Sequence, residues 1–590
     1  MPDSPNKLSQ FWHELKRRNV LRSLAIYAGS AFVFLEAATI IFPRWGFPNW
    51  TIDLVLYLLI LGAFITIIVS WIFDITPQGV QKTKPLEEST ETEKPAASKV
   101  WKAATFISLV VIAGLLTFNI FGGTRSLKAG DIQSLVILPF DNFTGDEQLE
   151  NMVSGMHSLL IGDMGRIGGL RVLGNTTSNK YKDAVLSAPE IAAELNVDAV
   201  LEATVMCLGD SVCMQFRLVS TSGNEEQLWV ADYREDKSQI LNLFNRITRQ
   251  IAEELIITIT PEEERILAKS RTVNKEALDE FLKINRNDFS REMLYKYLEY
   301  LNNAAEKEPD WAPIYAALAN VWLTIAQVGY EPMEIAGPKI FENLNKALEL
   351  DPDLAEGHGL TGLIAFLTEW DWEKAETGLL KGLAANPSHA GARVLYAQLL
   401  CCLQRYDEAL IQGRLAIELD PLNPLVQAWY GAVLTFTGDF ETALAYGEKV
   451  RADDPGNVGA NMIIGVAAFK CGDYDKAMEA ARYFLPFEGV DFKEVEIIYE
   501  ESGFVAAYEE VLRQKEVLAQ KGYVPPVSLA DKYMMVDQPD KAMDWLEKGF
   551  EAHDPVMPYI ATHGYFFEPL FDNPRFIDIL EKMNLPLPNR

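Results

Sequence analysis

The stretch WEKAETGLLKGLAANP at residues 372–387 returns as YDEALIQGRLAIELDP at 406–421 and as FETALAYGEKVRADDP at 440–455. In each copy an alanine follows an aromatic residue by three positions, and a proline follows that alanine by twelve. The copies are 34 residues apart. Because proline breaks a helix, one proline in every period predicts a protein built from repeated helical hairpins.

A third mark keeps the same period. Ala397, Gly431 and Gly465 stand where the two helices of a hairpin must approach closely. Together the three marks resemble the tetratricopeptide repeat, a family of helix-turn-helix units that usually bind other proteins. Weaker copies continue the pattern, and we expect about six or seven units over residues 273–553, enough to bury a continuous core. We call residues 273–553 the repeat array, and we expect residues 554–590 to form a carboxy-terminal cap.

The first 121 residues are predicted to be a membrane anchor. Three predominantly apolar stretches, at about 20–42, 52–73 and 103–121, are each long enough to cross a bilayer as a helix. Lysine and arginine gather before the first stretch and between the second and third, whereas Arg44 is alone in the remaining loop. The positive-inside rule therefore places the amino terminus in the cytoplasm and residues 122–590 outside it.

The chain beyond the anchor is acidic. The formal net charge of the whole chain is −30 at pH 7, and the part beyond residue 121 carries −32. Such a field repels the phosphates of nucleic acid, so we expect no nucleic-acid partner. It also repels anionic lipid headgroups, so this part of the chain is expected to stand off the membrane surface.

Residues 132–258 change to a mixed pattern of short apolar runs and helical spacing. The runs predict strands at 134–139, 170–173, 199–208, 211–219 and 227–233. The helical spacing predicts helices at 149–164, 189–195 and 238–255. This is the pattern of a small α/β domain. The predicted fold class is therefore multidomain, with three transmembrane helices, a small α/β domain and an all-α tetratricopeptide repeat solenoid.

The hairpin within 199–219 can be registered from its side chains. A two-residue turn at 209–210 gathers the apolar residues of both strands on one face. In that register Cys207 lies opposite Val212, one residue away from Cys213, so the two cysteines point to opposite faces. We therefore expect no disulfide between them.

Several motifs outside the repeats resemble one group of bacterial membrane proteins. FWHELKRRNV at 11–20 and WIFDITPQG at 71–79 resemble their two-span amino-terminal module. VILPFDN at 136–142 and AELNVDAVLE at 193–202 resemble a domain similar to the amino-terminal domain of TolB and to FlgO. The family usually shows Arg-Thr-Ser where this chain has Asn-Thr-Thr at 175–177. The resemblance implies a bacterial inner (plasma) membrane protein with residues 122–590 in the periplasm.

Relatives of this group often carry a winged helix or a nucleotide cyclase domain. The predicted cytoplasmic segments, roughly the first 19 residues and 74–102, leave no room for either, and 74–102 is typical of a disordered linker. The sequence also lacks HExxH, a P-loop and CxxC, and its histidines are scattered. We therefore expect no enzyme activity, and we predict no catalytic residue, cofactor or metal site.

Two functions remain open. The first is an inner-membrane-anchored periplasmic scaffold or adaptor that binds protein partners through the repeats. The second is a transmembrane signal transducer that senses an extracytoplasmic ligand. In either case the expected partners are a protein or peptide in the groove of the repeats and the lipid bilayer around the three helices. A homo-oligomer or a larger membrane complex is a further possibility.

The concave face of a tetratricopeptide array is lined by fixed positions of each first helix, and the resemblance assigns those positions here. The predicted partner-binding groove comprises Leu363, Phe366, Leu367, Val394, Gln398, Cys401, Phe436, Met462, Val466, Phe469 and Lys470. Relatives that clamp a terminal carboxylate use several basic residues, whereas this groove offers one. We therefore expect the groove to take an apolar or amphipathic helix. The alternative is that another part of this protein, or a second copy, already fills it.

Overall fold

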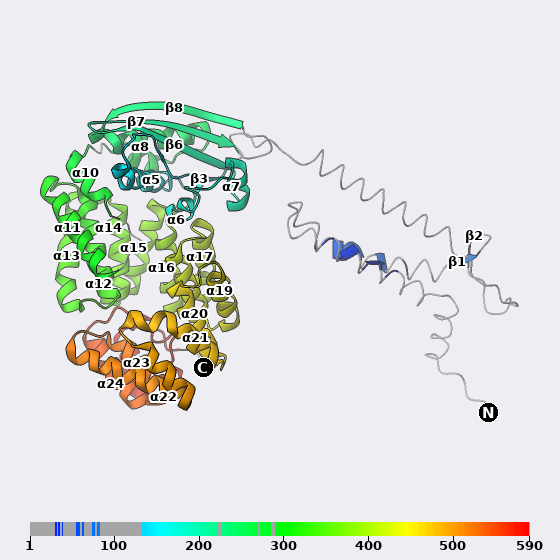
Figure 1. The fold of residues 1–590 in the computed structure, drawn as a ribbon, viewed down its shortest axis with the longest axis vertical. Helices are drawn as coiled ribbons and strands as arrows, with labels where there is room; N and C mark the ends of the chain where they lie inside the picture. Colours follow the sequence, from blue (N-terminus) through cyan, green and yellow to red (C-terminus); the bar gives the residue numbers. More distant parts are fainter. Residues whose placement is uncertain are drawn as a thin grey trace. The chain divides into compact units, whose positions relative to one another are not determined.

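The computed structural model describes residues 132–220, 226–269, 272–284 and 290–588, together with scattered positions between 27 and 82. The chain divides into two compact units, Met1–Gly123 and Thr124–Arg590. In the second unit, the α/β domain lies at one end of the repeat array, and the last helices of the array lie at the other end (Figure 1).

In the first unit, two short antiparallel strands are described, β1 (Phe73–Thr76) and β2 (Gly79–Lys82). They fall in the segment predicted to be a disordered linker, where Ile75 pairs with Val80. Both residues are β-branched, which favours strands over unstructured chain. Among the described residues, no helix is long and apolar enough to cross a membrane. The spans predicted at 20–42, 52–73 and 103–121 lie mostly or wholly outside those residues.

The α/β domain contains one mixed sheet. Its strands are β3 (Ser134–Ile137), β4 (Asp141–Asn142), β5 (Arg171–Val172), β6 (Ala199–Leu208), β7 (Ser211–Ser220) and β8 (Glu226–Asp236). The order is β5-β3-β6-β7-β8, with β4 also pairing with β6. Its main helices are α5 (Glu150–Met164), α6 (Asn175–Asn179), α7 (Ala188–Leu195) and α8 (Ile240–Glu254). The predicted strands and helices are all present, and β4 and α6 are additional.

The core of this domain lies between the sheet and two of the helices. Phe216 of β7 and Phe244 of α8 are fully buried there with Met156 and Leu160 of α5. Alternate residues of the central strands face the other way. Val136 and Val200 pack with α7 on the opposite face. The alternation that predicted strands is thus the alternation between these two layers.

The register of the β6–β7 hairpin corrects one prediction. From Ala199 to Val205 the pairs are those expected from the apolar pattern, with Val205 opposite Met214. A bulge after Val205 then shifts the register by one, so that Cys207 lies opposite Cys213. Their Cα atoms are 4.8 Å apart and the two cysteines form a disulfide. The prediction of unbonded cysteines was wrong because it assumed an uninterrupted ladder.

His157 of α5 is fully buried in the α/β domain. Its Nε2 lies 2.8 Å from the carbonyl oxygen of Ile137, and its ring packs edge-on against Phe140. Burial disfavours the charged imidazolium and lowers the pKa of His157 to about 4, from 6.5.

This buried histidine predicts a pH dependence. Because the pKa of His157 is lowered in the folded state, neutral His157 contributes fully to the free energy of unfolding above pH 6.5. This contribution is lost as the pH falls through about 4. The loss amounts to about 3 kcal/mol. We expect urea unfolding of the wild type and of His157→Gln to differ in stability near pH 7, and the difference to shrink by pH 4. A difference that stays constant over this range would contradict a neutral buried His157.

The repeat array is a run of antiparallel helices. They are α10 (Lys275–Leu282), α11 (Arg291–Lys307), α12 (Ala312–Gln327), α13 (Met333–Leu350), α14 (Ala355–Ile364), α15 (Trp372–Ala385), α16 (Ala390–Cys402), α17 (Tyr406–Leu419), α18 (Pro424–Phe436), α19 (Phe440–Asp453), α20 (Val458–Lys470) and α21 (Tyr474–Phe484). The last helices are α22 (Phe492–Lys521), α23 (Pro526–Met535) and α24 (Pro539–Glu551). Helical hairpins repeat with the period that the sequence predicts.

The helix ends follow the same period. His389, Asn423 and Asn457 cap the amino ends of α16, α18 and α20, each accepting a backbone N–H with its side chain. Gly362 of α14 and Gly378 of α15 show how closely a hairpin packs, because a Cβ on either would lie 2.5 Å from a backbone nitrogen of the other helix. Period, caps and close approach thus specify the same hairpin.

Two irregularities depart from the repeat. Pro352 and Pro387 are 35 residues apart, one more than the period, and a π-helical turn at Ala365–Glu369, which follows α14, absorbs the extra residue. Where the period lapses, α22 is a long helix broken at Gly503, whose φ of 82° interrupts the helix. Beyond α24 the chain forms two short 3-10 turns, Met557–Tyr559 and Glu568–Leu570, and then α25 (Pro574–Lys582).

Candidate functional site

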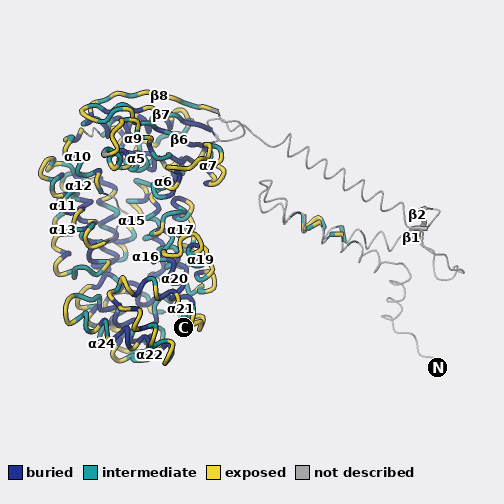
Figure 2. Tube along the Cα trace, in the orientation of Figure 1, coloured by how far each residue is buried: buried dark blue, intermediate teal, exposed yellow. Residues whose placement is uncertain are grey.

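The first helices of the repeats, α14, α16, α18 and α20, carry the predicted groove residues. Most of these residues are buried, and α16, which carries three of them, is largely dark in Figure 2. The buried ones are Leu363, Phe366, Leu367, Val394, Gln398, Cys401 and Phe436. Val466, Phe469 and Lys470 are partly buried, and Met462 is 48% exposed. The predicted residues thus form two sets, one fully buried and one partly buried or exposed.

The groove is covered in part by the chain's own C-terminal segment, by which we mean residues 554–571. Tyr559 inserts between two groove residues, with its ring centroid 5.5 Å from that of Phe366 and 5.2 Å from that of Phe436. Its hydroxyl donates a hydrogen bond of 3.0 Å to Oε1 of Gln398. One tyrosine therefore joins three successive repeats from the concave side.

The main chain of the C-terminal segment also lies against the groove. The amide of His563 donates to the carbonyl oxygen of Phe436 at 3.3 Å. A Cβ on Gly564 would come within 2.3 Å of the Phe436 ring, so a larger residue at 564 would displace that ring. The backbone at Gly564 thus lies so close to the Phe436 ring that only a residue without a side chain fits there.

The other end of the groove holds the segment through Phe469 and Lys470. The Phe469 ring packs edge-on against Phe566 at 4.6 Å. The ammonium of Lys470 donates to the carbonyl oxygen of Tyr565 at 2.8 Å and forms an ion pair with Glu568. Burial lowers the pKa of Lys470, although Glu568 acts in the opposite direction. The one basic residue predicted in the groove is thus engaged within the chain.

The depth of this packing decides whether a partner could replace the segment. Its large apolar side chains that are at most 9% exposed are Met557, Tyr559, Ile560, Phe566, Phe567 and Leu570. Uncovering all six costs about 9–18 kcal/mol at roughly 1.5–3 kcal/mol each. Whole domains are stable by about 5–15 kcal/mol. The C-terminal segment is therefore part of the folded array and not a loosely held plug, which favours the alternative that the sequence left open.

The accessible part of the groove lies near the amino ends of the first helices. Met462 and Val466 of α20 belong to it, together with the partly buried Trp429 of α18. A Cβ on Gly391 would contact the Trp429 ring at 4.0 Å, so this ring lies against α16. The predicted helix-binding surface is thus reduced to this half, and partner binding there stays a prediction.

A second contact, which the sequence did not predict, joins the α/β domain to the turns between repeats. Oδ1 of Asp420 accepts hydrogen bonds from the amide and hydroxyl of Thr177, at 2.9 and 2.6 Å. Nδ2 of Asn423 donates to the hydroxyl of Thr176 at 3.1 Å. Burial raises the pKa of Asp420, and the hydrogen bonds from Thr177 and Asn423 oppose that rise. Thr176 and Thr177 therefore hold the repeat array against the α/β domain.

Neighbouring turns make the same kind of contact. The hydroxyl of Ser388 accepts from the amide of Val172 at 3.2 Å, beside Pro387. Arg265, in the short helix α9 (Pro261–Leu267), pairs with Asp353 at 2.7 Å, beside Pro352. Two successive Pro-containing turns thus dock on the α/β domain, and the turn before them pairs with α9, which follows that domain in the chain. The repeated Asp-Pro and Asn-Pro pairs were the available signal, but they were interpreted only as helix breaks.

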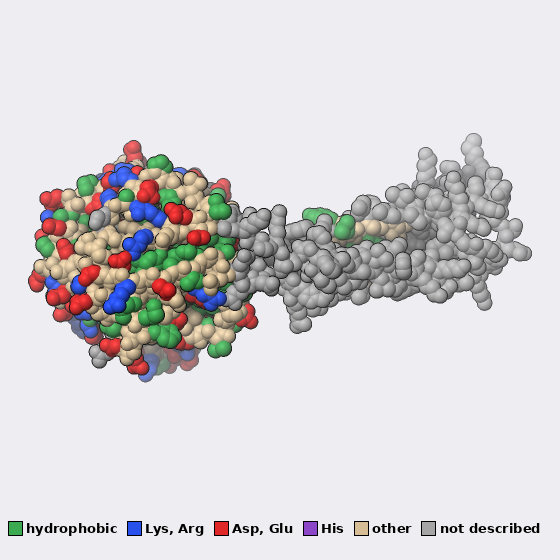
Figure 3. All heavy atoms as spheres, turned by 90° about the horizontal axis from the view of Figure 1, so that it is seen from above, with side chains coloured by type: hydrophobic (Ala, Val, Ile, Leu, Met, Phe, Trp, Pro, Cys, Tyr) green, Lys and Arg blue, Asp and Glu red, His purple; other side chains and the backbone are tan. Residues whose placement is uncertain are grey.

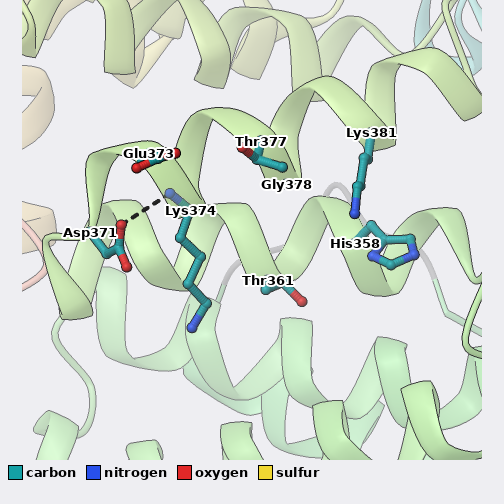
Figure 4. A pocket seen from close by; sticks show the side chains of 8 residues that line it. All are labelled: His358, Thr361, Asp371, Glu373, Lys374, Thr377, Gly378 and Lys381. Atoms are coloured by element: carbon teal, nitrogen blue, oxygen red, sulfur yellow. Dashed lines mark hydrogen bonds between the residues drawn. The ribbon is translucent and has the colours of Figure 1, made fainter.

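No clear small-molecule site is present in the described part of the chain. A shallow pocket of about 360 Å³ lies between α14 and α15. In Figure 4, His358, Lys374 and Lys381 surround it, but Lys374 is paired with Glu369. A pocket of about 600 Å³ beside Gly503 is lined by acidic and aromatic residues. Among the described residues, no three His, Cys, Asp or Glu side chains are placed to hold a metal ion.

Comparison with known proteins supports the repeat prediction. A family model described as tetratricopeptide repeat matches residues 364–424 and 436–487. The chain therefore contains tetratricopeptide repeats, which confirms that part of the sequence interpretation. Such repeats typically serve as protein-binding scaffolds without catalytic activity. Membrane anchoring, the TolB- and FlgO-like assignment and the periplasmic location stay predictions.

One curated relative is named "Putative adenylate cyclase 3", from Rhizobium meliloti (strain 1021). It is 26% identical over 194 residues, which is 32% of this chain and 33% of the relative. The chain thus spans about a third of the length of that protein. The match carries no assignment of cyclase activity to this chain, and the absence of enzyme activity remains an expectation.

Several solved structures resemble parts of the chain. YrrB, described as a tetratricopeptide repeat protein with an unusual peptide-binding site, is 22% identical with a TM-score of 0.23, covering 34% of this chain and 98% of its own. The type IV pilus biogenesis factor PilW is 18% identical with a TM-score of 0.28, covering 36% and 94%. Yeast Tom70 is 19% identical with a TM-score of 0.28, covering 49% and 58%.

The covered half of the groove predicts a contrast between two variants. Phe436 is 7% exposed against Tyr559, whereas Met462 is 48% exposed. We expect Phe436→Ala to destabilise the array by about 3–5 kcal/mol, because it leaves a cavity beneath the C-terminal segment. Met462→Ala should change stability by no more than about 0.5 kcal/mol. Urea unfolding of the full chain in detergent, followed by tryptophan fluorescence, measures both. Equal stabilities of the two variants would show that the segment does not fill the groove.

Proposed function

We propose that this chain is a membrane-anchored, extracytoplasmic scaffold that binds other proteins through its tetratricopeptide repeats. The observation that carries the proposal is the way the concave face holds an irregular chain segment. Aromatic side chains of the repeats enclose Tyr559, and Lys470 and Phe436 contact main-chain atoms of the C-terminal segment. A surface that binds one segment in this manner has the chemistry to bind a second.

The partner surface is the accessible half of the groove. Trp429 and Val466 are partly buried there and Met462 is exposed, so all three leave apolar surface accessible. An apolar or amphipathic helix of a partner fits this surface, because burial of each large side chain is worth roughly 1.5–3 kcal/mol. Binding at this half requires no displacement of Tyr559.

Two further observations support the extracytoplasmic location. The disulfide between Cys207 and Cys213 belongs to an oxidising compartment, since cytoplasmic thiols are kept reduced. The strong negative charge beyond residue 121 suits a part that stands away from anionic lipid. Both agree with the topology that the lysine and arginine asymmetry predicts.

Site-specific crosslinking tests the partner surface. A photoreactive amino acid replaces Met462 in one variant and Ile411 of α17 in a matched control, since both residues are 48% exposed. In whole cells we expect Met462 to give a discrete crosslinked species containing an envelope protein, and Ile411 to give none. Ile411 lies on a second helix of a hairpin, away from the predicted concave positions.

Three results would count against this assignment. Equal crosslinking at both positions would mean that the groove confers no selectivity. The absence of a crosslinked protein at Met462 would mean that the accessible half is not a binding site. Crosslinks to cytoplasmic proteins alone would contradict the extracytoplasmic location.

Protease accessibility tests the topology separately. In spheroplasts with an intact inner membrane, added protease should degrade residues 122–590, because they are expected outside the cytoplasm. A cytoplasmic marker protein should survive in the same sample as the control. Degradation of residues 122–590 that requires permeabilisation of the inner membrane would reverse the proposed orientation.

A further inference from the structure

Strand β8 forms one edge of the sheet in the α/β domain. It is 11 residues long and, within the described ranges, pairs only with β7. In Figure 1 it is the outermost strand, and no described element lies beyond it. Figure 3 looks onto this end of the unit and shows hydrophobic atoms and backbone in a stripe between scattered charges. A long edge strand of this kind presents unpaired backbone groups to another strand.

The side chains of β8 alternate between two faces. Tyr233 faces the core, where its ring packs edge-on against Phe216. Asp232 and Arg234 are exposed on the outward face. On that face Gln215 of β7 donates to Asp232 at 2.8 Å. Polar side chains therefore line the outward face of both strands. At the free edge they include one acid, Asp232, and one base, Arg234.

We propose that β8 pairs antiparallel with β8 of a second copy of this chain, so that two α/β domains share one continuous sheet. The register places Tyr233 opposite Tyr233 of the second copy, on the two-fold axis. Asp232 then lies opposite Arg234 of the second copy, and Arg234 opposite its Asp232. Residues 230–236 of each copy form the pairing.

Charge complementarity selects this register among its neighbours. A register shifted by one residue is excluded. It would place Tyr233 opposite Arg234 of the second copy, and these side chains point to different faces of β8. Directly opposite residues of an antiparallel pair lie on the same face of a sheet. Moving the axis to residue 232 places Asp232 opposite itself, and moving it to residue 234 places Arg234 opposite itself. Like charges directly opposite each other are destabilising. Of these three positions of the two-fold axis, the one at Tyr233 places Asp232 of each copy opposite Arg234 of the other.

Charged residues on an edge strand can also serve to prevent pairing. The spacing distinguishes the two roles. Residues that only repel would be expected to carry one sign, whereas an acid and a base two positions apart are complementary across a two-fold axis. The arrangement at Asp232 and Arg234 therefore favours a second copy over a random strand as the occupant of the edge.

A charge-swap cycle tests the proposal in the full chain, solubilised in a mild detergent. Sedimentation equilibrium measures the mass and the dissociation constant of the dimer. We expect a dimer for the wild type. Asp232→Arg and Arg234→Asp should each raise the dissociation constant roughly tenfold or more, since each replaces two opposite-charge contacts with two like-charge contacts. The double variant should return it to within about threefold of the wild type, because the opposite charges are restored in exchanged positions.

Two controls accompany the cycle. Lys346→Asp on α13 changes the net charge by the same amount as Arg234→Asp, away from the sheet, and should leave the dissociation constant unchanged. Circular dichroism of each variant confirms that it is folded. A monomeric wild type would overturn the proposal. So would a dimer that survives the single swaps, or a folded double variant that dissociates as readily as the single variants.

Discussion

The second unit depends on the burial of Tyr559 between Phe366 and Phe436. Without this contact the concave face of the array would expose a row of large apolar side chains, which monomeric proteins rarely do. Because the C-terminal segment is covalently attached, it binds without the loss of translational freedom that a separate partner suffers. A free peptide with the same side chains would therefore compete poorly with it. The C-terminal segment therefore stays in its half of the groove, whatever binds in the other half.

The turns between repeats impose a second constraint. A proline at each turn ends one helix, and the polar residue two positions after it caps the start of the next helix. Asp420 uses its remaining hydrogen-bonding capacity on Thr177 of the α/β domain, at the cost of burying a carboxylate. The contact is therefore specific, because a buried carboxylate without those donors would be strongly disfavoured. One short motif thus both sets the repeat and fixes the neighbouring domain.

Periodicity explains what the sequence could predict. Apolar spacings of 3.6 and 2 residues predicted the helices and strands, and the 34-residue period predicted the hairpins. The resemblance to tetratricopeptide repeats then assigned the groove positions. Periodicity could not predict the bulge before Cys207, because the apolar residues fit an uninterrupted ladder as far as Val205 and only the last pairs of the hairpin are shifted. Nor could it give the C-terminal segment, whose 3-10 turns have no sustained period. Tyr559 meets Phe366 from almost 200 residues away, and no local signal encodes that distance.

Positions at the two ends of the first helices differ in exposure, and this difference locates the accessible surface. Phe436 near the end of α18 is covered, whereas Met462 in the first half of α20 is not, because the segment crosses the carboxyl ends of the first helices. The opposite ends of α16 and α18 follow the turns that dock on the α/β domain. A helix bound beside Trp429 would therefore lie close to that domain as well. The α/β domain would then form one wall of the partner site, beside the turns that bind it.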